Sequence, residues 1–84
     1  MMTKETFGSS YAAGHTAGYQ YAGTVVDEPV IMEIATDEAE DFADECEQTG
    51  DADVINGYSK GVIDGWRYGR QAISEMLKST PDNH

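Results

Sequence analysis

The chain is poor in the residues on which disulfide-stapled, metal-binding and membrane proteins depend. Its one cysteine, Cys46, cannot form an intrachain disulfide, which favours a reducing compartment. Its two histidines, His15 and His84, are too few for a zinc site of several Cys or His ligands or for the Glu-x-x-His pairs of a di-iron bundle. No apolar run is long enough to span a bilayer, and residues 1–5 lack the charged-then-apolar order of a signal peptide. We therefore expect a cytoplasmic protein with no metal and no cofactor.

Large aliphatic side chains are also scarce. Leu, Ile, Val and Phe together account for 13 of the 84 residues, below the roughly 20% at which a high net charge indicates disorder. A chain of this length buries only about 60% of the surface that its unfolded form exposes, so it holds a single domain, residues 1–84. Order in this domain must therefore depend on Tyr, Ala and Gly.

Basic residues are heavily outnumbered by acidic ones. Sixteen Asp and Glu against five Lys and Arg give a formal net charge of −11 and an isoelectric point near 4.2. Nucleic acids and anionic lipids are bound by cationic surfaces that displace counterions, so this charge argues against direct binding to nucleic acid or membrane. It favours a basic protein surface as the partner.

What the chain does contain is apolar residues at helical spacing in three segments. The spacing predicts helices over about residues 3–22, 29–48 and 53–78, followed by a frayed tail at residues 79–84. We predict an all-α fold, a compact three-helix domain in which the third helix packs on the first and the acidic second helix lies across both.

Capping signals agree with these bounds. Asp27 or Glu28 can cap the second helix, and Pro29 suits its first turn, where the missing N–H is not needed. Gly50 follows the last apolar residue of that helix, at the place where a helix stop is expected. The residues after Gly50 then form a short link, in which either Asp51 or Asp53 caps the third helix.

Two local alternatives stay open. Apolar residues alternate over residues 30–35, which also fits a short strand or hairpin within residues 24–35 and would give an α+β fold. The pairs Asn56-Gly57 and Asp64-Gly65 accept the positive φ of a type I′ turn and so also fit hairpins. Residues 70–78 are helical on either interpretation.

Glycines recur every four residues in the first and third predicted helices, with aromatic residues between them. Four glycines in the third helix cost about 3–4 kcal/mol relative to alanine, a large part of a net stability of roughly 4–13 kcal/mol. Close approach of another helix to the bare backbone would offset this cost. The glycines therefore predict either Gly-xxx-Gly packing within the chain or a dimer face between two chains. The candidate residues for this role are Gly14, Gly18, Gly61, Gly65 and Gly69, with Gly57 and Ala22 in the same two series.

Acidic residues are segregated along the chain. Residues 5–59 contain thirteen Asp or Glu and no Lys or Arg. Eight of these acids fall on the second helix within about 21 Å, or roughly one charge per 2.6 Å, which is of the order of the one per 1.7 Å of duplex DNA. A solvated helix face, or adaptation to a high-salt cytoplasm, gives the same pattern. The candidate partner-binding residues are Glu33, Asp37, Glu40, Asp41, Asp44 and Glu47, and the further candidate contacts are Tyr19, Tyr21 and Tyr68.

With these features the chain resembles the small, acidic, phage-encoded DNA-mimic inhibitors, a class that includes anti-restriction and anti-CRISPR proteins. The resemblance is one of size and charge, and it covers mainly residues 27–53. It implies a stoichiometric inhibitor that occupies a basic nucleic-acid site on a host enzyme or defence complex in the host cytoplasm. The third helix departs from a uniformly acidic mimic because it carries four of the five basic residues, Lys60, Arg67, Arg70 and Lys78.

Catalysis is not indicated. His84 is the last residue, His15 falls at the margin of an apolar helix face, and Cys46 falls in an apolar stripe, so no nucleophile is paired with an oriented base. We expect a binding protein, not an enzyme: an inhibitor that binds a basic, nucleic-acid-binding surface as a phosphate-backbone mimic. The alternative is a self-associating helical structural protein with a glycine- and tyrosine-lined dimer face.

Overall fold

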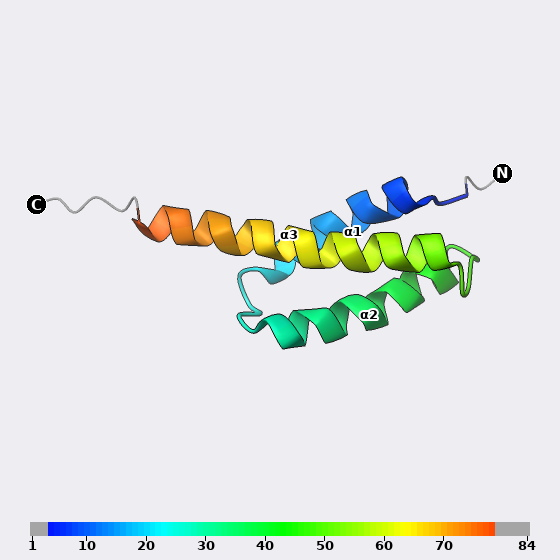
Figure 1. The fold of residues 1–84 in the computed structure, drawn as a ribbon, viewed down its shortest axis with the longest axis horizontal. Coiled ribbons are helices and arrows are strands. Elements are labelled where there is room, and N and C mark those ends of the chain that lie inside the picture. Colours follow the sequence, from blue (N-terminus) through cyan, green and yellow to red (C-terminus); the bar gives the residue numbers. More distant parts are fainter. Residues whose placement is uncertain (1–3, 79–84) are drawn as a thin grey trace, which may run out of the picture.

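A computed structural model describes residues 4–78, and these residues form three α-helices. Helix α1 spans Phe7–Tyr21, α2 spans Glu28–Glu45 and α3 spans Ala52–Lys78 (Figure 1). The predicted all-α, three-helix fold is confirmed. Residues 30–35 belong to α2, and both glycine pairs considered as hairpin turns lie inside α3, so none of the described segments is a strand. The predicted tail at residues 79–84 lies outside the described residues.

Helix α1 begins later than predicted, at Phe7, because a capping box stops it there. The backbone N–H of Ser9 donates to Oγ1 of Thr6 over 3.2 Å, and the backbone N–H of Thr6 donates to Oγ of Ser9 over 2.9 Å. These two bonds satisfy N–H groups that have no partner inside the helix. Residues 4–6 are therefore not helical, although the prediction began the helix near residue 3.

Helix α2 ends three residues earlier than predicted, and Gly50 is not its terminator. The N–H of Gln48 donates to the carbonyl of Ala43 over 2.8 Å, and that of Glu47 donates to the carbonyl of Asp44 over 3.0 Å, which is the Schellman pattern. The left-handed residue of this motif is Glu47, with φ 61°, where glycine is usual. Gly50, with φ 77°, lies farther along in the connection to α3.

Of the two residues predicted to cap α3, Asp51 and Asp53, the structure shows Asp51 in this role. Its Oδ1 accepts from the backbone N–H groups of Asp53 and Val54 over 3.0 and 3.3 Å. Gln48 donates to the other carboxylate oxygen over 3.0 Å and also exchanges two hydrogen bonds with the main chain of Glu5. These hydrogen bonds lower the pKa of Asp51, and the bond from Gln48 has the largest effect. One side chain thus joins the start of α1 to the connection between α2 and α3.

Helices α1 and α3 run parallel and are packed main chain against main chain (Figure 1). A Cβ added to Gly57 would lie 2.5 Å from the carbonyl oxygen of Phe7, and one added to Gly69 would lie 2.5 Å from Cβ of Ala22. The same substitution at the other glycines of the two series would bring Cβ within 3.0 Å of a carbonyl group of the facing helix; these glycines are Gly14, Gly18, Gly61 and Gly65. All six are buried inside one chain. The residues considered for a dimer face are thus used in the contact between α1 and α3.

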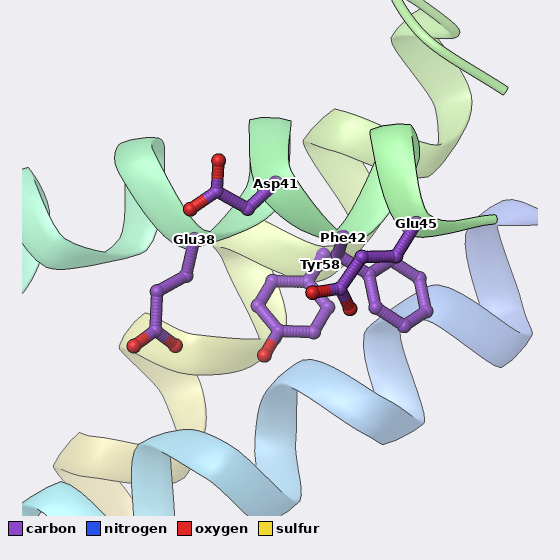
Figure 2. A pocket seen from close by; sticks show the side chains of 5 residues that line it. All are labelled: Glu38, Asp41, Phe42, Glu45 and Tyr58. Atoms are coloured by element: carbon purple, nitrogen blue, oxygen red, sulfur yellow. The ribbon is translucent and has the colours of Figure 1, made fainter. Parts of the chain in front are cut away.

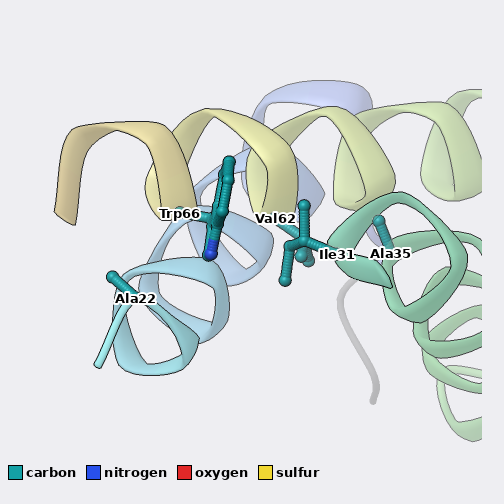
Figure 3. Packing of buried hydrophobic residues seen from close by; sticks show 5 residues of the cluster. All are labelled: Ala22, Ile31, Ala35, Val62 and Trp66. Carbon is teal, nitrogen blue, oxygen red and sulfur yellow. The ribbon is translucent and has the colours of Figure 1, made fainter. Parts of the chain in front are cut away.

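Helix α2 packs mainly on α3 and touches α1 little, so it does not lie across both helices as predicted (Figure 1). A row at four-residue spacing is buried, namely Ile31, Ala35, Ala39 and Ala43. Ile31 and Ala35 meet Val62 and Trp66 of α3 in the apolar core, which Ala22 completes (Figure 3). Trp66 Nε1 donates to the carbonyl oxygen of Val25 over 2.7 Å. The core therefore holds α2 with one face against α3 and the opposite face in solvent.

Candidate functional site

The outward face of α2 carries the predicted partner-binding residues. Because one row of α2 is buried against α3, the side chains on the opposite side of the helix point to solvent. All six candidates are exposed, and at 100° per residue the five that lie within α2 fall within an arc of roughly 100°. The six are Glu33, Asp37, Glu40, Asp41, Asp44 and Glu47. The structure thus brings these residues together on one face, with Glu47 just beyond the helix end.

Basic side chains within residues 4–78 do not neutralise this face. Arg67 binds Glu28 at the start of α2, with Nε and Nη2 at 2.9 and 2.5 Å from Oε2. Lys60 lies 3.7 Å from Asp64 on α3 itself, and Arg70 donates to the carbonyl oxygen of Ala22 over 2.9 Å. None of these cations reaches the six exposed carboxylates. Part of the basic patch on α3 is therefore engaged within the chain, and the salt bridges within residues 4–78 do not involve the six carboxylates.

A shallow cavity of about 220 Å³ lies along one edge of this face, between α2 and α3. Its lining joins carboxylates and aromatic rings: Glu38, Asp41, Phe42, Glu45 and Tyr58 (Figure 2). The rings of Phe42 and Tyr58 are stacked, with centroids 4.5 Å apart and planes 25° apart. In Figure 2 the Tyr58 ring, from α3, lies between the carboxylates of Glu38 and Glu45, from α2.

Glu38 is held in place by a hydroxyl group from α1. The hydroxyl of Tyr21 donates to Oε2 of Glu38, and this bond, together with burial, raises the pKa of Tyr21 to about 12. Burial, followed by the charge of Glu38, also raises the pKa of Tyr58. Both hydroxyls therefore remain protonated at neutral pH and act as donors. The site offers carboxylate oxygens and ring faces, which are suited to holding a cation.

The other candidate contacts have different surroundings. Tyr19 and Tyr68 are exposed, at 48% and 61%, with ring centroids 5.9 Å apart, whereas Tyr21 is half-buried and bound to Glu38. His15 is half-buried beside Tyr68, with ring centroids 5.8 Å apart. Burial raises the pKa of the half-buried Cys46 thiol, which disfavours the reactive thiolate. His15 lies in the middle of α1, whereas Cys46 is the C-cap residue of α2.

Sequence reasoning missed the cavity. The sequence already indicated part of its lining, because Glu38, Phe42 and Glu45 have the i, i+4, i+7 spacing of one helix face. That face was not separated from the acidic stripe beside it. The contribution of Tyr58 was not accessible, since it comes from another helix and depends on how α2 sits on α3.

Three further findings bear on the class of protein. Among residues 4–78, no group of three or more His, Cys, Asp or Glu side chains is placed to hold a metal ion. No helix in that range combines the length and the apolar character needed to cross a membrane. Comparison of the chain with known protein families, curated proteins and solved structures finds no match.

Proposed function

We propose that this chain is a protein inhibitor whose α2 face binds a basic, nucleic-acid-binding surface of an enzyme or defence complex in the cytoplasm. The observation that carries the proposal is the set of six exposed carboxylates on one face of α2, none of them paired with a cation within residues 4–78. The five that lie within α2, from Glu33 to Asp44, extend over roughly 16 Å, which matches several phosphate spacings of a nucleic-acid strand.

The fold supports this use because it keeps the carboxylates in a fixed array. Like charges at i, i+4 repel by a few tenths of a kcal/mol per pair, so an isolated helix of this sequence would be weakened. Packing of Ile31 and the buried alanines against α3 holds the helix in spite of that repulsion. A partner that supplies Lys and Arg side chains relieves the repulsion, and the array needs no reordering to meet it.

Self-association through the glycine faces is not proposed. The glycines on which that alternative depended are buried between α1 and α3 of one chain. A second chain cannot reach them while that contact is formed.

The test is a capture experiment with matched charge variants. The immobilised chain is exposed to a cell lysate at low ionic strength, and the retained proteins are challenged with salt and with duplex DNA. We expect nucleic-acid-binding proteins to be retained, to be released by duplex DNA, and to be lost as salt screens charge over about 8–10 Å. The double variant Asp37→Lys/Asp44→Lys should abolish retention, mainly by slowing association.

The control carries the same change of charge elsewhere. Asp27→Lys/Asp53→Lys alters the net charge equally, but Asp27 and Asp53 lie outside the outward face of α2. It should retain the same proteins as the natural chain, and thermal melts establish that both variants are folded. Retention that is insensitive to salt and equal for both double variants would contradict the proposal.

A further inference from the structure

We propose that the cavity between α2 and α3 is a pocket for an arginine side chain of the partner. The inference rests on the proposed function, which it makes more specific by naming a residue that the basic surface must present. The outer carboxylates meet a partner as an array of charge, whereas the cavity offers a place for one flat cation (Figure 2).

The aromatic rings distinguish this cavity from the rest of the acidic helix. Phe42 and Tyr58 are half-buried and stacked on one another, so they form a rigid apolar wall between the two helices. A cation is attracted to the face of such a ring when it lies within about 6 Å of the centroid. The other exposed carboxylates of α2, such as Asp37 and Asp44, are not part of this ring-lined cavity.

Three carboxylates line the same cavity as the two rings. Glu38 is fixed by the hydroxyl of Tyr21, and Asp41 and Glu45 lie on the neighbouring turns of α2. A volume of about 220 Å³ is smaller than the roughly 300–1,000 Å³ of pockets for drug-sized ligands, so the cavity fits one side chain.

Arginine fits this arrangement better than lysine. Its guanidinium is planar, stacks on aromatic faces and carries five N–H donors that reach two carboxylates at once. The ammonium of lysine is a compact charge that keeps its water more strongly and cannot stack. The pocket should therefore select arginine over lysine, although both have the same charge.

The experiment is an NMR titration of the full chain, with N-acetyl-arginine amide and N-acetyl-lysine amide as probes at low ionic strength. We expect arginine amide to shift the ring resonances of Phe42 and Tyr58 in a saturable manner, and to bind several-fold more tightly than lysine amide. Tyr58→Leu should weaken arginine binding by roughly two- to five-fold, the range given by an exposed cation–π contact. Tyr19→Leu, on an exposed tyrosine outside the cavity, should leave the binding unchanged.

A second pair of variants tests the rim without disturbing the packing of Tyr58. Asp41 and Asp44 are both exposed on α2, but only Asp41 lines the cavity. Asp41→Asn should reduce arginine binding more than Asp44→Asn does. Equal binding of the two probes, or equal effects of the two substitutions, would contradict the proposal that this cavity binds arginine.

The two proposals fail separately. Arginine-selective shifts at Phe42 and Tyr58 support the pocket even if the lysate experiment contradicts the proposed function. Salt-sensitive, DNA-competed capture without arginine-selective shifts overturns the pocket and leaves the proposed function in place.

Discussion

Along the side of α3 that meets α1, glycines bring two main chains together, whereas along the side that meets α2, isoleucine and alanine side chains fill the contact. At five of the six glycines in the first contact, an added Cβ would meet only backbone atoms, which cannot shift as a flexible side chain can. The second can adjust, because rotamers and side-chain positions absorb small changes of volume. The α1–α3 pair is therefore the rigid frame of the molecule, and the acidic helix is attached to it through an adaptable contact.

The largest effect is expected from adding one carbon to the frame. A Cβ at Gly61 would lie 2.8 Å from the backbone nitrogen of His15 and within 3.0 Å of the Tyr11 carbonyl, so the two helices must separate. Gly61→Ala should lower the free energy of unfolding by about 3 kcal/mol, at the upper end for overpacking, in spite of the better helix propensity of alanine. Urea denaturation measures this change.

Gly23→Ala is the matched control for that substitution. A Cβ at Gly23 would meet no atom within 4 Å, so the same added carbon should be neutral or stabilise by up to about 1 kcal/mol. If both variants unfold at the same urea concentration, the close approach of α1 and α3 is wrong.

Removing one carbon from the other contact should cost less. Ile31 is fully buried where α2 meets α3, and Ile31→Val leaves a small cavity that the neighbouring side chains partly close. We expect a loss of about 1 kcal/mol in the free energy of unfolding, measured in urea. Val30→Ala, on a side chain that is 46% exposed, should change it by less than about 0.5 kcal/mol. A loss at Ile31 as large as that at Gly61 would remove the distinction between the two contacts.

The α1–α3 pair also contains a buried hydroxyl group that has no hydrogen-bond partner. Ser10 is fully buried in α1, and its hydroxyl has no hydrogen-bond partner in the structure. Ser10→Ala removes the cost of that buried hydroxyl and should stabilise the protein by about 1 kcal/mol. Ser9→Ala breaks the exposed capping box and should destabilise it by roughly 0.5–1 kcal/mol. Thermal denaturation of the two variants gives opposite shifts, and a destabilised Ser10→Ala would show that the hydroxyl is satisfied.

The sequence predicted the frame and the acidic face better than it predicted how they meet. Helical periodicity placed all three helices, and the four-residue spacing of the glycines drew attention to the residues that lie between α1 and α3. Helix ends were less accessible, because Thr6 acts through a capping box and Glu47 adopts a left-handed conformation usual for glycine. The cavity required knowledge of which side of α3 faces α2, and no spacing within a single segment contains that information.

The weakest of the three helix contacts, between α1 and α2, includes one polar bond whose strength depends on pH. Tyr21 of α1 donates to Glu38 of α2, and its pKa in the folded chain is about 12, above the ordinary value of 10.0. Because the unfolded chain loses this proton first, the contribution of the bond is complete below pH 10 and is lost as the pH rises through about 12. We expect the free energy of unfolding to fall over that interval.

Tyr21→Phe isolates this contribution from that of the other tyrosines. The variant lacks the hydroxyl, so its stability at neutral pH should be lower than that of the natural chain, and its decline between pH 10 and 12 should be shallower. The pKa values of Tyr11 and Tyr58 are also raised, so part of the decline should persist in the variant. Urea denaturation across this pH range measures both slopes. If the two slopes are parallel, the hydrogen bond from Tyr21 to Glu38 contributes no stability. The position of Glu38 at the cavity then depends only on the packing of α2 against α3.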